Sequence, residues 1–416
     1  MTSSDHRRQP AQRIWLRVLL TMSFAATAGA GLAAGWTVSQ DQTSDATAPA
    51  GWSGEQIDDL SVGTLNSLVV GEAKSALAAE ARRVLHGREA RSAAVPFAAY
   101  TLRLRPNWTP AAADLVSGKF RSPVVVHYEL SVDHAMAART VDATFVLSKQ
   151  GWQLKRLGRD GSDLWEHESV DAARSGRSLV IGATVYSSRL PSLAAQVEQA
   201  RADVAGFWSA KWPANVVVLL PSKPSLMNPL VGSDSASQLP AAATFDRGKN
   251  RPVIRITLNP DVFFGLPYIA QQIVLRHEIT HVAQDALGSR YAPTWLTEGL
   301  AEYVGYRGTG IATSIVAGDA LSAAAANGPP ASFPRESTFN FDRAEADRRL
   351  GYEEGWALCR MVADRYGESQ LVPLYRAAAT GDAPTRSRID DATRRVLGIS
   401  EAELIREWQS WLVDNS

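Results

Sequence analysis

The chain has 416 residues, more than one typical domain holds, so two or three folded units are expected. Its 43 basic residues balance its 43 acidic ones, which gives no electrostatic reason to expect a nucleic-acid partner or capture by an anionic membrane surface. The single cysteine, Cys359, excludes an internal disulfide and leaves a zinc–thiolate site without its usual set of ligands.

The N-terminus has the pattern of a membrane-targeting segment. A basic tail, residues 1–17, precedes an uncharged run at residues 18–38 that is about as long as a bilayer requires. Such a flank keeps the N-terminus in the cytoplasm and sends the following chain across the membrane. We predict a single-pass anchor in the cell membrane, with the folded part of the chain outside the cytoplasm. Small residues at Ala28 and Ala30 also suit signal cleavage, which would make the protein secreted.

Residues 39–52 are mostly small and polar and indicate a flexible linker, and residues 53–175 then follow an α+β pattern. Apolar residues between Ile57 and Leu85 recur at helical spacing. Four strand-like runs come next: Phe97–Arg105, Val124–Asp133, Val141–Lys149 and Trp152–Leu157. A helix followed by an antiparallel meander resembles the NTF2-like and cystatin-like accessory domains. Two roles are open for this domain: it binds a protein partner, or it covers the functional site of the rest of the chain.

Residues 176–416 begin with a second sheet pattern. Strands are expected at Leu179–Tyr186, Asn215–Leu220, Ala241–Phe245 and Val253–Leu258. An amphipathic helix over Leu193–Trp208 separates the first two strands. The nearly all-apolar run Asn215–Leu220 suits the covered interior of a sheet. A longer helix is expected from about Pro267 to Gly288.

This longer helix carries the sequence His277-Glu278-Ile279-Thr280-His281. Residues four apart lie on one face of a helix, so the two histidines can offer imidazole nitrogens to one zinc ion. The carboxylate of Glu278 is then placed to act on a water that the metal holds. No histidine follows His281, so the third metal ligand is expected to be a downstream carboxylate.

Glu298 is the candidate for that carboxylate. It follows on a second, short helix that Pro293 opens. Glu302, one turn further on, shares its face and is placed to accept a hydrogen bond from a ligand histidine, which would fix the orientation of that ring. Each motif alone has an ordinary explanation, because H-E-x-x-H arises by chance on many helices and a lone glutamate suits a solvated surface.

The combination is more specific. H-E-x-x-H followed by Trp295-Leu296-Thr297-Glu298-Gly299 resembles the gluzincin clan of zinc peptidases, and is closest to the small bacterial peptidases of the MA-like group. The resemblance covers Ser178 to the C-terminus and implies a Zn²⁺ ion held by His277, His281 and Glu298. The G-x-M-E-N motif of the large aminopeptidases is missing from the sequence, which argues against that activity.

The same resemblance implies two further features. The edge strand of the sheet should bind the substrate backbone, and either Val253–Leu258 or the neighbouring Ala241–Thr244 is that strand. A tyrosine on a downstream helix should stabilise the oxyanion. Tyr352, expected at the start of a helix that runs to about Tyr366, is the candidate, with Tyr303 and Tyr306 as competitors.

The C-terminal remainder is expected to be mainly helical. A helix over Ser314–Ala326 is predicted within a Gly/Ala/Ser/Pro-rich stretch. Ser400 and Glu403 form a capping box that opens the terminal helix. The predicted fold class is therefore α+β: a zincin-like peptidase domain with a small mixed sheet and a helical C-terminal half, preceded by a helix-plus-antiparallel-sheet domain and a membrane segment.

Two functions follow from these patterns. The first is zinc-dependent hydrolysis of peptide bonds in protein or peptide substrates outside the cytoplasm, with Glu278 as the general base. The second is a catalytically silent scaffold of the cell envelope, in which the accessory domain binds a partner and the metal site is structural or vestigial. An intact Glu278 favours the enzyme.

Overall fold

The computed structural model describes residues 62–208, 212, 215–246, 253–285, 292–340, 343–379 and 386–416. Contacts within the chain divide these residues into two units. An accessory unit contains residues 62–172 and 245–253, and a second unit contains Ala173–Thr244 and Ile254–Ser416. The predicted basic tail, membrane segment and linker lie outside the described residues. Within the described ranges, no helix is both long and apolar enough to cross a bilayer.

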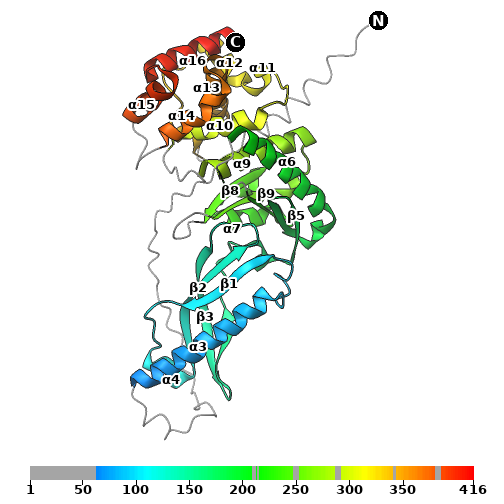
Figure 1. The fold of residues 1–416 in the computed structure, drawn as a ribbon, viewed down its shortest axis with the longest axis vertical. Helices are drawn as coiled ribbons and strands as arrows, with labels where there is room; N and C mark the ends of the chain where they lie inside the picture. The colour runs from blue at the N-terminus through cyan, green and yellow to red at the C-terminus, as the bar shows by residue number, and fades with distance from the viewer. Residues whose placement is uncertain are drawn as a thin grey trace. The chain divides into compact units, whose positions relative to one another are not determined.

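The accessory unit consists of one long helix packed on a four-stranded antiparallel sheet (Figure 1). This confirms the predicted helix-plus-meander arrangement. Its elements are α3 (Val62–Leu85), β1 (Phe97–Leu104), α4 (Ala112–Ser117), β2 (Lys119–Leu130), β3 (Ala137–Ser148), β4 (Gly151–Leu157) and α5 (Leu164–His167). Strand β2 begins five residues before the predicted Val124, because the ladder to β3 continues through Pro123, which pairs with Asp142.

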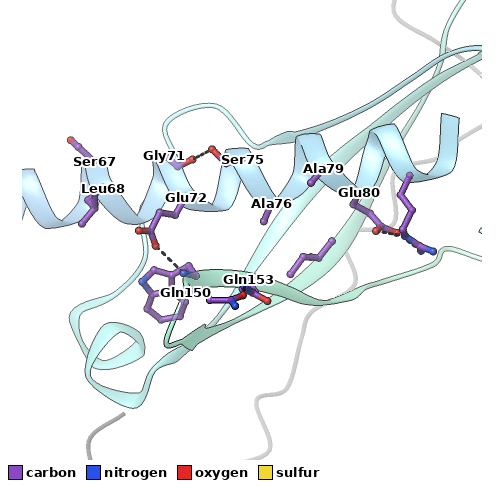
Figure 2. A pocket seen from close by; sticks show the side chains of 13 residues that line it. Ser67, Leu68, Gly71, Glu72, Ser75, Ala76, Ala79, Glu80, Gln150 and Gln153 are labelled. Atoms are coloured by element: carbon purple, nitrogen blue, oxygen red, sulfur yellow. Dashed lines mark hydrogen bonds and ion pairs between the residues drawn. The ribbon is translucent and has the colours of Figure 1, made fainter. Parts of the chain in front are cut away.

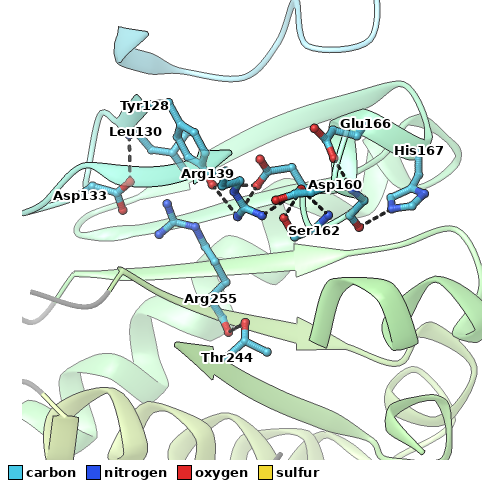
Figure 3. Close-up of polar contacts among 12 residues, drawn as sticks. Tyr128, Leu130, Asp133, Arg139, Asp160, Ser162, Glu166, His167, Thr244 and Arg255 are labelled. Atoms are coloured by element: carbon cyan, nitrogen blue, oxygen red, sulfur yellow. Dashed lines mark hydrogen bonds and ion pairs between the residues drawn. The ribbon is translucent and has the colours of Figure 1, made fainter. Parts of the chain in front are cut away.

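Two polar features mark this unit. A groove of about 780 Å³ lies between α3 and β4, where small side chains of the helix leave space and Glu72 accepts a hydrogen bond of 2.8 Å from the Trp152 backbone (Figure 2). Elsewhere in the unit, the buried Asp163 accepts hydrogen bonds from the Tyr128 hydroxyl at 2.7 Å and from Arg139 at 3.1 Å (Figure 3). This cluster fixes the start of α5 to the sheet.

Most residues of a five-stranded sheet, in the order β5-β6-β7-β9-β8, belong to the second unit. Its strands are β5 (Val170–Ser175), β6 (Ser178–Ala183), β7 (Val216–Leu220), β8 (Ala241–Asp246) and β9 (Val253–Leu258). The β6–β7 and β7–β9 pairs are parallel, and β6 and β7 are buried at every residue, as expected for strands covered on both faces. Of the two candidate edge strands, β8 lies at the edge and β9 lies inside the sheet.

Helix α6 (Leu190–Trp208) packs on the sheet and on α9 (Tyr268–Asp285), the helix that carries the two motif histidines. The chain then becomes helical, as predicted, which confirms the mixed α+β class. The larger helices that follow are α10 (Thr294–Tyr306), α12 (Gly318–Asn327), α13 (Glu345–Tyr366), α14 (Leu371–Ala378), α15 (Arg386–Leu397) and α16 (Glu401–Asn415). The predicted capping box of Ser400 and Glu403 opens α16.

Two helix predictions were wrong in detail. The stretch predicted as one helix over Ser314–Ala326 is two helices, α11 (Thr313–Val316) and α12, separated at Ala317, whose backbone leaves the helical region with φ −117° and ψ 32°. Helix α13 begins at Glu345 rather than at Tyr352. Acidic residues in its first turn interact favourably with the helix dipole and extend the helix two turns upstream.

Close contacts through glycines position α10 between α9 and α13. A Cβ atom on Gly355 of α13 would lie 2.8 Å from the Trp295 carbonyl oxygen and 3.2 Å from the Cα of Gly299. On the other side, a Cβ atom on Gly305 would lie 3.2 Å from the Ile273 carbonyl oxygen of α9. Backbones approach this closely only where the side chain is a hydrogen atom, so these glycines set the position of the helix that carries Glu298.

Candidate metal centre

Helix α9 brings its two motif histidines together. The Nε2 atoms of His277 and His281 are 3.0 Å apart, and each side chain is about 1% exposed. The two lone pairs of such nitrogens repel unless a proton or a cation lies between them. One turn of helix therefore directs two imidazoles at one point, as the spacing predicted.

Helix α10 brings the carboxylate of Glu298 to the same point. Its Oε2 atom lies 3.5 Å from the Nε2 atom of His277 and 3.5 Å from that of His281. Tetrahedral zinc ligands at roughly 2.0–2.1 Å from the ion are separated from one another by about 3.3–3.5 Å. The triangle of ligand atoms, with sides of 3.0, 3.5 and 3.5 Å, is therefore close to the one that zinc requires.

The hydrogen bonding of Glu298 also fits a cation. Its Oε2 atom is buried and has no hydrogen-bond partner among the described residues. A buried carboxylate oxygen without a partner is costly, and a cation shared with the two imidazoles would satisfy it. Two imidazole nitrogens and one carboxylate oxygen are a known set of three protein ligands for catalytic zinc. The residues present therefore fit a zinc ion.

Glu302, one turn after Glu298, faces the other nitrogen of His277. The Glu302 Oε1 atom lies 3.3 Å from the Nδ1 atom of that ring. Both atoms are buried. The sequence did not specify which of the two histidines Glu302 would contact, and in the structure it is His277.

The charges in this cluster shift its protonation strongly. Burial disfavours the imidazolium form of His277, but Glu298 and Glu302 outweigh burial and raise the pKa of His277 to about 10. Burial likewise opposes ionisation of Glu298, but His281 and His277 outweigh it and lower the pKa of Glu298 to about 2. Glu298 and Glu302 thus favour a positive charge next to the nitrogens of His277 and His281. A bound metal ion would supply that charge in place of a proton.

Glu278 is also buried, at 3% exposure. Burial raises its pKa, while the two histidines oppose that rise. Its carboxylate accepts a hydrogen bond from the backbone N–H of Ala243, a residue of the edge strand β8. The residue predicted as the base is therefore anchored to the strand predicted to bind a substrate backbone.

Sequence reasoning missed Gln284, which lies one turn after His281 on α9. Its Oε1 atom is 2.7 Å from His281 Nδ1, and its Nε2 atom donates to the Thr297 carbonyl oxygen at 2.8 Å. The i, i+3 spacing was a signal available in the sequence. A glutamine is uncharged, however, and the search for partners of the histidines considered carboxylates.

The three candidate tyrosines lie in different surroundings. Tyr352 is 1% exposed and stands three residues before Gly355 on α13, with its ring edge-on to Phe339 at 5.4 Å. The Tyr303 hydroxyl, near the C-terminal end of α10, donates a hydrogen bond to Glu368 at 2.9 Å. The Tyr306 hydroxyl is buried without a hydrogen-bond partner. The role of Tyr352 stays a prediction.

Comparisons with known proteins gave matches to solved structures only. No family model matches the chain, and no curated protein matches it. The yeast LTA4 hydrolase is 12% identical with a TM-score of 0.37, over 68% of this chain and 43% of that one. An M1 zinc metallopeptidase from Deinococcus radiodurans is 14% identical with a TM-score of 0.35, over 72% of this chain and 61% of that one.

This chain therefore spans less than two thirds of either structure. Both are named for hydrolases, and the second is named for a zinc enzyme. Identities of 12–14% with TM-scores below 0.5 establish neither the fold family nor the activity of this chain.

Proposed function

We propose that this protein is a zinc-dependent peptidase of the gluzincin type, with a zincin-like catalytic unit. The observation that carries the proposal is the buried triangle of His277, His281 and Glu298, with Glu278 beside it. Three protein ligands leave one position of a tetrahedral ion for a water, which is the arrangement of a catalytic rather than a structural zinc site.

The residues have distinct roles in the proposed reaction. A zinc ion held by His277, His281 and Glu298 would lower the pKa of a bound water to about 7 and would polarise a carbonyl group. Glu278 accepts the proton of the attacking water and later delivers it to the leaving amine. Burial raises the pKa of Glu278, which favours retention of the accepted proton until it is delivered.

The proposed substrate is an extended peptide. Strand β8 is at the edge of the sheet, and its residue Ala243 contacts Glu278 through the backbone. A peptide added to this edge by main-chain hydrogen bonds would lie beside the proposed base. We further propose Tyr352 as the donor to the oxyanion, a contribution of about 3–4 kcal/mol for one such donor in related chemistry. The variant Tyr352→Phe should then lose kcat while it keeps its zinc.

The proposed location is outside the cytoplasm, and it rests on residues 1–38 alone. Fusion of a reporter enzyme that folds only after export to the C-terminus of the full chain tests this proposal. An active reporter is expected, and an inactive one at normal expression would contradict the location without affecting the metal site.

Metal analysis and a peptide-library digest of the purified full chain test the function together. We expect about one zinc per chain and cleavage within peptides, and we expect Glu278→Gln to keep the zinc and lose turnover. Full activity in Glu278→Gln would remove Glu278 from the role of base. A well-folded wild-type protein that binds no zinc and cuts no peptide would instead support the scaffold function.

A further inference from the structure

We propose that Gln284 is a positioning residue that fixes the tautomer of His281 and ties that ring to the helix carrying Glu298. The inference rests on the proposed zinc site. Its claim is that one uncharged side chain couples ligands from two helices, so that α9 and α10 present their ligand atoms as a unit.

The orientation of the Gln284 amide follows from its contact with Thr297. A backbone carbonyl oxygen only accepts hydrogen bonds, so the amide group 2.8 Å from the Thr297 oxygen must be the NH₂. The amide oxygen of Gln284 then necessarily faces His281. The Thr297 carbonyl oxygen on α10 thus determines the orientation of the Gln284 amide.

The tautomer of His281 follows from that orientation. The Gln284 oxygen lies 2.7 Å from His281 Nδ1 and only accepts, so Nδ1 carries the hydrogen atom. In a neutral imidazole the other nitrogen, Nε2, is then the acceptor. That nitrogen is the one 3.5 Å from Glu298 Oε2, at the point where the metal would lie.

Gln284 also connects the two helices next to their ligands. It is the second-last residue of α9, and its partner Thr297 immediately precedes Glu298 on α10. The amide is 2% exposed, so water competes little for its hydrogen bonds. A displacement of α10 would therefore break the contact that orients His281, and loss of the contact would release α10 near Glu298.

An amide at position 284 can both accept from His281 and donate to Thr297, which a carboxylate cannot do. The cluster already buries Glu278, Glu298 and Glu302, while His277 and His281 are its two histidines. Glutamate at position 284 would add a fourth carboxylate and would have no hydrogen to donate to Thr297. It would keep the acceptor for His281, however, so this substitution separates the two halves of the proposed role.

Zinc affinity, measured by competition with a chelator, tests the proposal in the full chain. We expect both Gln284→Met and Gln284→Glu to bind zinc about 10–100-fold more weakly than wild type, the usual effect of losing such a supporting partner. The matched control is Gln272→Met. Gln272 is buried on the same helix and donates to the Gln196 carbonyl oxygen, away from the ligands, so its zinc affinity should stay within about twofold of wild type.

Weak binding by Gln284→Met with normal binding by Gln284→Glu would overturn the coupling of the helices, because the acceptor alone would then suffice. Normal binding by both variants would overturn the whole proposal. A loss in Gln272→Met equal to that in Gln284→Met would also overturn it, by showing that any buried glutamine on α9 has this effect.

A nuclear magnetic resonance experiment on zinc-free protein with ¹⁵N-labelled histidine tests the tautomer independently of catalysis. The His281 ring should carry its hydrogen on Nδ1 in wild type and should lose this preference in Gln284→Met. An unchanged ring in the variant would contradict the role of Gln284. If wild-type protein binds zinc but cuts no peptide, the proposed function fails, yet both measurements still decide the role of Gln284.

Discussion

Each of the two units buries a cluster of charged side chains, and the clusters differ in how their oxygen atoms are used. In the accessory unit, Asp163 accepts hydrogen bonds from Tyr128 and Arg139, so a cation of the chain itself compensates the buried charge. In the second unit, Glu298 and Glu302 are as deeply buried, yet one oxygen of each has no hydrogen-bond partner in the part of the chain that the structure describes.

The difference distinguishes an anchor from a ligand site. A buried carboxylate whose partners belong to the chain stabilises one arrangement of the backbone. Buried carboxylates that face histidine nitrogens at 3.3–3.5 Å are instead arranged for a positive charge, which a proton on an imidazole or a bound cation supplies. Burial alone does not distinguish the two kinds of site, but the hydrogen-bond partners of the carboxylates do.

The largest expected effect comes from breaking the ligand site itself. Glu298→Gln keeps the size of the side chain and removes its charge, so zinc affinity should fall by about 100-fold or more, since each ligand carries a large share of the roughly 10–16 kcal/mol typical of a structural zinc site. Chelator competition measures the change. Zinc binding equal to wild type would remove Glu298 from the set of ligands.

A second substitution tests whether the position of α10 matters as well as its carboxylate. Gly299→Ala should lower the free energy of unfolding by about 3 kcal/mol, because its Cβ atom would collide with the backbone of Gly355, and it should weaken zinc binding. Urea denaturation and chelator competition measure both. The matched control is Gly206→Ala in α6, where, apart from the adjacent helix backbone, no atom of the described residues lies within 4 Å of the added methyl group.

The control should stabilise the protein slightly, by about 0.5–1 kcal/mol, since alanine favours the helix over glycine. If Gly299→Ala is as harmless as Gly206→Ala, then the close contact of α10 and α13 does not determine the site.

Breaking the anchor in the accessory unit should have the opposite pattern. Asp163→Asn removes the charge that compensates Arg139, so stability should fall by about 2 kcal/mol, in the range found for hydrogen bonds to charged groups. Zinc affinity should not change. A loss of zinc binding with normal stability would show that the two clusters do not have the separate roles inferred from their partners.

The smallest effect concerns pH. Glu353, on α13, accepts hydrogen bonds from the backbone of Asp319 and Ala320 and is therefore an anchor within the second unit. Burial raises the pKa of Glu353 to about 7, above its ordinary value of 4.5. The stabilisation from its protonated form is thus complete below pH 4.5 and is lost as pH rises through 7.

Relative to Glu353→Gln, wild-type protein should lose about 1–2 kcal/mol of stability between pH 5 and pH 8, part of the roughly 1.4 kcal/mol per pKa unit that a full shift would give. Denaturation series at the two pH values measure it. The same pH dependence in both proteins would show that Glu353 does not titrate in this range.

The sequence predicted those features that repeat along one element. The spacing of His277 and His281 follows from helix geometry, and the apolar run at β7 indicated a buried strand. It left the choice of edge strand open, because the order of β9 and β8 depends on pairing between distant segments.

Features that depend on contact between two elements were not predictable in this way. The sequence gives no direct sign that Gly299 meets Gly355, or that the Gln284 amide reaches Thr297 across a turn. The start of α13 was missed for a related reason, since its first two turns carry charged residues with no apolar stripe. Patterns local to one helix or strand were therefore recovered, and the contacts that join them required the structure.

X-ray absorption at the zinc edge of the zinc-loaded full chain tests the central claim most directly, because it counts the atoms around the ion. The account predicts two imidazole nitrogens and further oxygen ligands at roughly 2.0–2.2 Å, with no sulfur. It also predicts that Glu298→Gln or His281→Ala alters this shell. A shell with one imidazole, or one unchanged by both substitutions, would contradict the claim that α9 and α10 together hold a catalytic metal.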